Sequence, residues 1–562
     1  MSRVKEHNRF FRFVVKTLSR HFPFLWRYVS RLYIGVLKAI NKKQYNTWAN
    51  HNEALCFAQS YQSKNPLVSI IVPAFNTDKQ HFLEMIYSVI NQHYQNWELI
   101  IVNASTDELC KQSINKCVNI DTRIRLIVKE KNQGISGNTN EGIKNANGDY
   151  IAFLDHDDLL HPCALHSVVR EIEQNNADLV YTDEDKVNEE GGFYFGGHFK
   201  PDWSPALLEN VNYINHLSII KTSYVKGVGV LRPEYDGAQD YDLLLRIIDK
   251  YNPRVSHVPK VLYHWRAAQT STASDITTKS YVMEAGNSAL QQHLKRCKIK
   301  ATSEIIANKP GFYRVKYQQP EQITVIIGEV DSQYYPNCAR WLGSLLSKYG
   351  ANNIQLIIEE WAAGHQIRDI HSNTVFVPEG KSYLKNAVAA ATNEIVIYFQ
   401  VAAMPRTIDD IFNLAAVVEQ TDTFAAQPVL VDRLNMIRDS GLVDEQFGLQ
   451  PLFKGTRLGE NTYFGNTDWV RNISRVSCGV VAIKKSNLAR VVNNNDVANW
   501  LVPYQLPIEA AYTVWAHSVF HYKGSLALRQ KSKYFNSQLE HASYQLLTKN
   551  FGWEKDEDIF DE

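Results

Sequence analysis

The sequence predicts an α/β fold in which helices cover both faces of a mostly parallel sheet, and it predicts this plan twice along the chain. From about Pro66, short apolar runs alternate with stretches of helical periodicity, which is typical of parallel strands joined by right-handed helical crossovers. The chain has 562 residues, of which 44% are hydrophobic and 11% aromatic, enough for more than one buried core. We therefore expect two large domains.

The first half contains five expected strands, each a short run rich in aliphatic and β-branched residues: 67–72, 98–102, 124–128, 150–154 and 178–182. Helices are expected between them. One covers the stretch in which apolar residues recur at helical spacing (Phe82, Met85, Ile86, Val89 and Ile90), one runs from Gly134 to about Ala146, and one follows Pro162.

The strand at 150–154 ends in three carboxylates, Asp155, Asp157 and Asp158. Clustered carboxylates repel one another unless a cation or hydrogen-bond donors compensate them. Because ligands of open α/β sheets bind at the carboxyl ends of parallel strands, a divalent metal is the simplest compensator. The alternative is a solvated turn that caps the helix near Pro162.

The composition excludes some function classes. The formal net charge is +1, which supplies no general attraction for phosphate backbones, so no nucleic-acid partner is expected. The seven cysteines contain no C-x-x-C pair, which fits a reducing cytosol, and neither a zinc site nor a disulfide framework is expected.

Residues 1–65 are expected to form a basic, aromatic, helical extension. The first 43 residues hold eleven Lys and Arg against a lone Glu6, interleaved with aromatic and aliphatic residues. Helices of this kind lie on an anionic membrane surface, whereas no apolar stretch reaches the roughly 18 residues needed to span a bilayer. We expect peripheral membrane contact; the alternative is a basic helical pair docked on the body of the protein.

Eight segments of the first half, in order, resemble family 2 glycosyltransferases of the GT-A fold. They are VSIIVPAFN (68–76), WELIIV (97–102), NQGIS (132–136), DHDD (155–158), YTDEDK (181–186), FKPDWSP (199–205), GAQDYDL (237–243) and YHWR (263–266). The resemblance covers about residues 66–295 and implies a Rossmann-like GT-A domain at 66–300. Members of this branch usually build bacterial surface polysaccharides such as O-antigen, rhamnan or capsule.

The resemblance implies a site for a nucleotide diphosphate sugar. Its nucleotide contacts would be Pro73, Ala74, Phe75, Asn76, Asn103, Gly134, Asp155 and His156. Phe75 could equally be a core residue. Many relatives read the imide edge of uracil with a carboxylate where this chain has Asn103, which can accept a hydrogen bond but carries no charge. UDP and dTDP are the expected nucleotides, with the base left open.

The resemblance also makes Asp155 and Asp157 the acidic pair of a metal site, and their i, i+2 spacing points both the same way in an extended segment. His264 matches a position at which some relatives add an imidazole ligand, although it could be a packed residue. Oxygen ligands suit Mg²⁺ or Mn²⁺, and an imidazole favours Mn²⁺. Asp158 is expected to act as a cap or a sugar contact.

Asp240 matches the family's general base, the carboxylate that takes the proton of the acceptor hydroxyl in an inverting transfer. The alternative is that it caps the helix that continues through Leu243. The residues expected at the donor sugar or the acceptor are Asp183, Glu184, Asp185, Trp203 and Gln239.

Residues 301–562 are expected to form a second GT-A-like domain, with strands at 323–327, 354–358 and 394–399. The last strand is followed by Gln400, Val401 and Ala402, where an active module has its acidic pair. Asp496 and His521 could stand for the base and the metal ligand. We expect an inactive module that supports folding, dimerisation into a homo-oligomer or acceptor placement.

The resemblance as a whole implies an inverting, metal-dependent hexosyltransferase in the cytoplasm, peripheral at the inner face of a bacterial plasma membrane. It would move a sugar from a nucleotide diphosphate sugar to a hydroxyl of a glycan or lipid-linked oligosaccharide in O-antigen or capsule synthesis. The alternative from another class is a non-catalytic scaffold in a polysaccharide assembly complex.

Overall fold

The computed structural model describes residues 65–267, 279–307 and 309–328, with 45–47 and 49–50 before them. In the second half it describes 343, 347–348, 350–360, 373–378, 382–399, 403–405, 409–421, 423–431, 435–445, 448–462, 465–473, 476, 480–493 and 513–522. The basic stretch at 1–43 lies outside these residues, as do Gln400, Val401, Ala402 and Asp496.

The first half forms one sheet. Its strands are β1 (Val68–Ala74), β2 (Trp97–Asn103), β3 (Ile124–Val128), β4 (Tyr150–Phe153), β5 (Leu159–Leu160), β6 (Leu179–Asn188), β7 (Tyr194–His198), β8 (Ser218–Lys221) and β9 (Val255–Ala267). The order is β3-β2-β1-β4-β8-β6-β9-β5, with β7 paired to β6. β3, β2, β1 and β4 are parallel, whereas β8 runs antiparallel to both β4 and β6.

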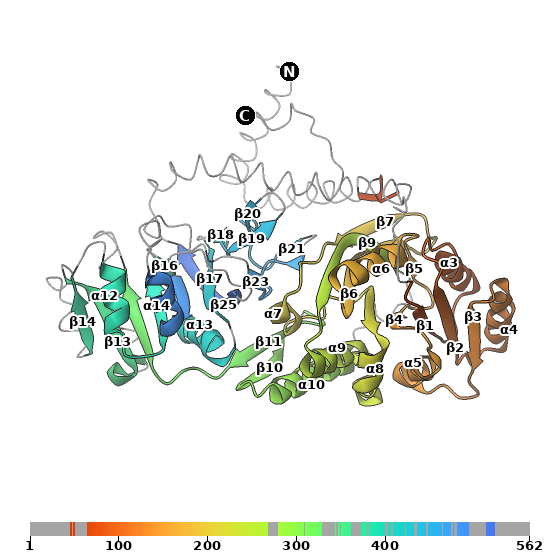
Figure 1. Cartoon of the computed structure of the whole chain (residues 1–562), viewed down its shortest axis with the longest axis horizontal. Coiled ribbons are helices and arrows are strands. Elements are labelled where there is room, and N and C mark those ends of the chain that lie inside the picture. The colour runs from red at the N-terminus through yellow and green to blue at the C-terminus, as the bar shows by residue number, and fades with distance from the viewer. Residues whose placement is uncertain are drawn as a thin grey trace, which may run out of the picture.

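Helices cover both faces of this sheet (Figure 1). They are α3 (Lys79–Ile90), α4 (Glu108–Cys117), α5 (Gly134–Asn145), α6 (Ala164–Asn175), α7 (Pro205–Leu208), α8 (Thr222–Gly227), α9 (Gln239–Tyr251) and α10 (Lys279–Arg296), with single 3-10 turns at Val118–Ile120 and Pro233–Tyr235. Phe82 of α3 and Val168 of α6 share one buried cluster. Ile143 of α5, Leu244 of α9 and Leu290 of α10 share the other, so apolar strands are buried on both sides.

The predicted α/β class is confirmed, with one correction to the sheet. The expected strand at 178–182 is the start of β6, but it does not lie beside β4, because β8 intervenes in the opposite direction. Neither β8 nor β9 was expected. β8 is four residues long and, unlike the equally short β4, is not marked by an acidic motif at its end. β9 contains Pro259, which counts against a strand in sequence reasoning.

The second half repeats the topology. Its main sheet contains β12 (Ile323–Ile327), β13 (Ile354–Glu359), β14 (Thr374–Val377), β15 (Ile395–Phe399), β16 (Ala403–Pro405), β17 (Ala425–Val431), β18 (Ile437–Asp439), β23 (Asn472–Ile473), β24 (Val480–Lys484) and β25 (Thr513–Tyr522). The order β14-β13-β12-β15-β24-β17-β25-β16, with β18 on β17, matches the order of the first sheet, and β23, which pairs with β25, is an additional strand. The chain therefore builds the same sheet twice.

The remaining elements of the second half lie around this sheet. The helices are α12 (Tyr383–Ala390), α13 (Asp409–Gln420) and α14 (Lys485–Asn493), with a 3-10 turn at Ala351–Asn353. Two small antiparallel pairs are β19 (Leu442–Glu445) with β20 (Gly448–Pro451), and β21 (Asn461–Thr462) with β22 (Gly465–Asn466).

A buried polar pair recurs at the same place in both sheets. In the first, the Ser69 hydroxyl of β1 donates to Glu98 Oε1 of β2 at 2.6 Å, and the same oxygen accepts a backbone N–H from the turn before β4. In the second, the Thr324 hydroxyl of β12 donates to Gln355 Oε1 of β13 at 2.9 Å, and that oxygen accepts a backbone N–H from the turn before β15. The repeat therefore extends from topology to individual hydrogen bonds.

The two halves are joined by a hairpin and by direct contacts. β10 (Ala301–Ile305) and β11 (Tyr313–Tyr317) pair antiparallel and lie between the two sheets in Figure 1. The Ser204 hydroxyl donates to Asn472 Oδ1, and the Asn472 N–H donates back to Ser204 Oγ, both at 2.9 Å. Trp469 lies in a buried cluster formed mainly by the first half.

None of the described helices combines the length and apolarity required to cross a bilayer.

Cys110 and Cys297 are free thiols, whereas Cys163 is disulfide-bonded. Scattered spacing did not predict this bond, because pairing depends on how close two cysteines lie in the fold.

Candidate active site

Loops after β1, β2 and β4 meet at the carboxyl edge of the parallel strands, where ligands of such sheets bind. Asn76, after β1, accepts the Thr106 N–H at 2.9 Å and donates to the Thr106 hydroxyl at 3.1 Å. Thr77 Oγ1 lies 2.8 Å from His156 Nδ1 in the loop after β4. Asn76 and His156, two of the predicted nucleotide contacts, therefore help to tie this edge together.

Further predicted nucleotide contacts line the same edge. Pro73 and Ala74 end β1, and Phe75 follows with 41% of its surface exposed, so it is not a core residue. Asn103 ends β2 and is fully buried. Its Oδ1 accepts the Ser105 N–H at 3.1 Å, and its Nδ2 has no hydrogen-bond partner within the described chain.

Gly134 opens α5 with a φ of +76°, and Asp236 fills the space beside it. A Cβ at this position would lie 2.7 Å from Asp236 Oδ2, and the Ser136 N–H donates to Asp236 Oδ1 at 3.3 Å. The first turn of α5 therefore has an anionic partner from its own chain, which its N-terminal dipole favours.

The three carboxylates after β4 differ in their surroundings. Asp155 and Asp157 are half-buried. Asp158 is buried, its Oδ1 accepts the Arg266 N–H at 2.8 Å, and its Oδ2 accepts the Tyr263 hydroxyl at 2.5 Å. Burial, together with the charges of Asp155 and Asp157, raises the pKa of Asp158 well above its ordinary value. Asp158 therefore anchors this loop to β9, and the other two carboxylates remain accessible.

His264 of β9 is buried against Asp185 of β6. Its Nδ1 lies 2.5 Å from Asp185 Oδ1, and the Tyr45 hydroxyl donates to Asp185 Oδ2 at 2.8 Å. Asp155, Asp157 and His264, all of them described, do not gather within 4.8 Å of one another as a ligand set. A carboxylate is the usual partner that orients a metal-bound imidazole, but the structure does not bring this imidazole to the acidic pair.

One group of His, Cys and Asp in the described ranges does have ligand-like spacing: Asp249 of α9 with His293 and Cys297 of the α10 end. The Asp249 carboxylate already contacts His293 Nδ1 at 2.6 Å and Arg296 Nε at 2.5 Å. Although burial lowers it, hydrogen bonds to Asp249, Cys297 and Glu209 raise the pKa of His293 to about 11. The imidazole is thus held as a cation, whereas a metal ligand must be neutral.

Asp240 lies in the first turn of α9 and is held by side chains from another loop. Asn212 Nδ2 donates to Asp240 Oδ2 at 3.1 Å, Asn215 Nδ2 donates to the same oxygen, and the Tyr241 N–H donates to Oδ1 at 2.8 Å. The N-cap of α9 is Ala238, so Asp240 is not its cap. Burial raises the pKa of Asp240.

Residues 212–217, called the base loop after the predicted role of Asp240, connect Asp240 to residues 155–158, the acidic loop. The His216 ring stacks on Tyr263 with ring centroids 4.9 Å apart. The Tyr263 hydroxyl accepts the Asp155 N–H at 3.5 Å and donates to Asp158. Asp240 and the acidic loop are therefore linked through two packed aromatic rings.

Glu184 of β6 holds the base loop from the other side. Its Oε2 accepts the His216 N–H at 2.5 Å and a hydrogen bond from Lys200 Nζ at 3.2 Å, and its Oε1 lies 3.5 Å from His198 Nδ1. Lys200 Nζ also donates to the His216 carbonyl at 2.6 Å. Burial alone would raise the pKa of Glu184, but Lys200, His198 and His216 lower it to about 2. The ion pair of Glu184 and Lys200 thus makes hydrogen bonds with both the backbone N–H and the backbone carbonyl of His216.

The other predicted sugar contacts have separate partners. Asp183 is buried, accepts the Lys200 N–H at 2.8 Å and contacts His257 Nε2 at 2.9 Å. Trp203 is half-buried against the core of the first half. Gln239 Oε1 accepts the Gly237 N–H at 2.7 Å. Among the three acids of β6, Glu184 is thus the one that contacts the base loop.

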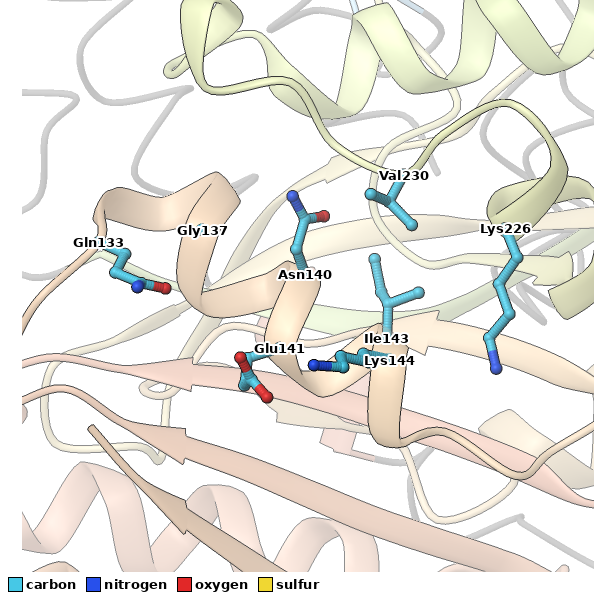
Figure 2. Close-up of a pocket in the computed structure, with 8 residues that line it drawn as sticks. All are labelled: Gln133, Gly137, Asn140, Glu141, Ile143, Lys144, Lys226 and Val230. Atoms are coloured by element: carbon cyan, nitrogen blue, oxygen red, sulfur yellow. The ribbon is translucent and has the colours of Figure 1, made fainter.

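A pocket of about 590 Å³ lies over α5, away from the three carboxylates. Figure 2 shows Asn140, Glu141 and Lys144 on the helix, with Lys226 and Val230 opposite. None of its lining residues is a predicted site residue.

Sequence reasoning missed the groups that surround Asp240. Asn212, Asn215, His216 and Lys200 were not singled out, because each belongs to a short polar stretch without a spacing that marks chemistry. The one available signal is the segment NVNYINH at 210–216, in which amides recur between apolar residues.

Comparison with known proteins matches part of the first half to a family model. Residues 69–225 match the model "Glycosyl transferase family 2". An O-antigen biosynthesis protein, RfbC of Myxococcus xanthus, is 26% identical over 447 residues, which is 75% of this chain and 34% of that protein. The hyaluronan synthase of Pasteurella multocida is 26% identical over 215 residues, 38% of this chain and 22% of that protein.

Other relatives are less informative about activity. An uncharacterized protein, y4gI, of Sinorhizobium fredii is 40% identical over 299 residues, 52% of this chain and 32% of that protein. The structure of S. aureus TarS 1-349 in complex with UDP-GlcNAc is 18% identical, covers 41% of this chain and 72% of that chain, and has a TM-score of 0.32, too low for a functional argument. The chain spans about a third or less of the length of these curated relatives.

Proposed function

Because residues 69–225 form a glycosyl transferase family 2 domain, we propose that this chain moves a sugar from a nucleotide diphosphate sugar to a hydroxyl group, with inversion at the anomeric carbon. The acceptor is a glycan or lipid-linked oligosaccharide of bacterial surface polysaccharide synthesis, the process for which the RfbC relative is named. Asp240 and His264 lie beyond the matched residues, so their roles rest on geometry and on the resemblance of their motifs.

The observation that carries the proposal is the link between two kinds of carboxylate. Asp155 and Asp157 are half-buried at the carboxyl edge of the parallel strands, and Asp240 is joined to their loop by the stacked rings of His216 and Tyr263. An inverting transfer needs both: acids for a cation at the diphosphate and a base for the acceptor.

Asp155 and Asp157 fit a divalent cation, because accessible carboxylate oxygens suit Mg²⁺ or Mn²⁺ and Asp158 is already engaged by β9. When bound, such a cation neutralises charge on the leaving diphosphate. In this proposal His264, whose ring Asp185 orients, approaches the acidic pair as a third ligand only when the cation binds.

Asp240 acts as the base in this proposal. Its carboxylate takes the proton of the acceptor hydroxyl while that oxygen attacks the anomeric carbon, an effect worth roughly 10²- to 10⁴-fold in rate. Asn212 and Asn215 both donate to Oδ2, which fixes the orientation of the carboxylate. Glu184, Gln239 and Trp203 line the sugar side, and Asp183 and Asp185 support β6 behind it.

The donor is a UDP or dTDP sugar. Pro73 and Ala74 contact the nucleotide from the end of β1, and Phe75 and Asn76 from the residues directly after it. The unpaired Asn103 amide at the end of β2 offers a donor to a carbonyl of the base. Gly134, Asp155 and His156 complete the nucleotide side.

We further propose that the second sheet has no transferase activity. The strand pairing aligns Val396 of β15 with Ile151 of β4. Counted along the sequence from these two residues, Gln400 corresponds to Asp155 and Ala402 to Asp157. At the carboxyl end of β12 in the second sheet, the Tyr383 hydroxyl donates to the Ile327 carbonyl at 2.6 Å. Next to it, a Cβ at Gly328 would collide with the Tyr398 hydroxyl. His521 lies in β25.

The cellular place in this proposal is the inner face of the bacterial plasma membrane, with the basic residues 1–43 on the lipid. Flotation with anionic liposomes tests it: the full chain should float, and removal of residues 1–43 should abolish flotation. Equal flotation of the two chains would contradict it.

The transferase proposal is tested by nucleotide release from UDP-, dTDP- and GDP-sugars with Mn²⁺ or Mg²⁺ and a bacterial lipid extract. We expect release from one donor, lost in Asp157→Asn and kept in the matched control Asp121→Asn, which changes a carboxylate at the opposite end of the strands. Nucleotide binding without release from any donor would favour the scaffold alternative.

A further inference from the structure

Two of the contacts between the second half and the first half come from residues three positions apart, Trp469 and Asn472. Asn472 exchanges hydrogen bonds with Ser204, and its Oδ1 also accepts the Ala206 N–H at 3.2 Å. Ser204 is the N-cap of α7, and its own N–H donates to the Tyr213 hydroxyl at 2.8 Å. Tyr213 belongs to the base loop, so only Ser204 stands between Asn472 and that loop.

Trp469 makes the second contact. Trp469 is buried, with 7% of its surface exposed, and it belongs to the cluster that contains Tyr213 and Ile214 of the base loop. Its ring packs edge-on against His198, with ring centroids 5.9 Å apart, and lies 5.3 Å from Phe312 of the joining hairpin. Gly465, with a φ of +89°, lies against the ring, where a Cβ would collide with it.

Both contacts lead to the groups that hold Asp240. His198 leads to Glu184, which together with Lys200 grips the His216 residue. Tyr213 lies between Asn212 and Asn215, whose amides donate to Asp240 Oδ2. The base loop is therefore supported from both sides by residues that touch the second half.

We propose that the second half is a positioning element of the transferase site, and that Trp469 and Asn472 hold the base loop so that Asn212 and Asn215 present Asp240 to the acceptor. This inference rests on the proposed role of Asp240. It gives the half without an acidic pair a task in the reaction of the other half. Trp469 and Asn472 act through the base loop and touch neither donor nor acceptor in this account.

Hydrogen–deuterium exchange of the full chain reads the coupling without any substrate. In Trp469→Ala and Asn472→Ala, amides of residues 212–217 should exchange about tenfold faster, because the base loop opens locally more often when a contact that holds it closed is removed. The edge at 68–76 should be unchanged. The control is Leu488→Ala, which truncates a buried side chain in a cluster formed entirely by the second half and should leave exchange at 212–217 unchanged.

Kinetics separate positioning from general destabilisation. With the donor that supports nucleotide release, both variants should lose about 10- to 100-fold in kcat, the effect expected of a displaced catalytic group, with the KM for the donor unchanged. Trp469→Phe should restore most of kcat, and it keeps the proposal testable if Trp469→Ala does not fold. Adding Trp469→Ala to Asn215→Ala should cost little more, because both act on one carboxylate.

Unchanged exchange at 212–217 in both variants would overturn this inference, as would an equal effect in Leu488→Ala. A loss confined to KM would also overturn it. Absence of nucleotide release by the unmodified chain would overturn the proposed function instead, so the two failures are distinct.

Discussion

The surroundings of Asp240, the proposed base, affect its pKa in two opposite ways. Burial raises its pKa, which makes the carboxylate a better proton acceptor, while the amides of Asn212 and Asn215 and the Tyr241 N–H donate to it. Donors to the charged form favour ionisation. Burial and these donors therefore act on the pKa of the Asp240 carboxyl in opposite directions.

This balance predicts a pH effect in Asn215→Ala. Losing one donor raises the pKa of Asp240 further, so the acid limb of the kcat profile should move to higher pH. Because the ionised form is the active one, activity is lost as pH falls through the pKa, and the variant should lose it first. Kinetics between pH 4.5 and 8 measure this, with Asn140→Ala, an amide on α5, as the control. An acid limb at the same pH in both variants would contradict the role of Asn215.

At the scale of single residues, sequence motifs located the carboxylates but not their partners. Asp155, Asp157 and Asp240 stand in motifs with fixed spacing, whereas Asn212, Asn215 and His216 act through a loop whose path depends on packing. Asp183 and Asp185 were grouped with Glu184 because they are adjacent in sequence. Their different partners, His257, His264 and Lys200, appear only when β6 has its neighbours.

Among the helices, α9 and α10 are joined by a buried ion pair that makes stability depend on pH. His293 lies 2.6 Å from Asp249 Oδ1, and the folded chain raises the pKa of His293 to about 11 from an ordinary value of about 6.5. A raised pKa stabilises the folded state fully below pH 6.5, and this contribution is lost as pH rises toward 11.

Urea unfolding at pH 7 and pH 9.5 tests this pair. The chain should be less stable at pH 9.5, and His293→Gln should remove most of that difference while costing about 3–5 kcal/mol at pH 7, as expected for breaking a buried pair. The control His166→Gln changes an imidazole whose pKa burial lowers, so it should keep the pH 9.5 loss. A pH difference that persists in His293→Gln would refute the assignment.

The polar pair repeated between strands predicts that the second sheet does not tolerate the glutamate that the first sheet has at the same place. Gln355 accepts from Thr324 and donates from its Nε2 to the Ala390 carbonyl at 2.9 Å. Gln355→Glu removes that donor and buries a charge beside the carbonyl, which should cost about 1–3 kcal/mol. Thermal unfolding of the full chain measures the loss. An unchanged melting temperature would show that the carboxylate finds another partner.

Strands with long apolar runs could be predicted from the sequence, and β1 to β4 and β12, β13 and β15 were found close to their bounds. β8 and β4 are both four residues long, but β4 ends at an acidic motif that draws attention to it, whereas β8 has no such motif. The position of β8 between β4 and β6 depends on tertiary packing, because the sequences of the two flanking strands do not indicate that an antiparallel strand lies between them. The duplication was predicted from three strands, but its extent became visible only in the strand order.

For the whole molecule, one sheet is made twice, but the sequence places the acidic pair Asp155 and Asp157 after β4 and Gln400 and Ala402 after β15. We therefore predict one metal-dependent nucleotide site per chain. Calorimetric titration of UDP with Mn²⁺ should give a stoichiometry of one, abolished in Asp157→Asn and unchanged in Asp496→Asn. Two sites, or loss in Asp496→Asn, would contradict a silent second half.

The most direct test of the central claim compares Asp157→Asn and Asp240→Asn in one assay of nucleotide release and Mn²⁺-dependent UDP binding. Both variants should lose release, by roughly 10²-fold or more for the base, but only Asp157→Asn should lose UDP binding, because Asp240 acts on the acceptor. Release that survives in either variant would contradict the assignment of these carboxylates to the site.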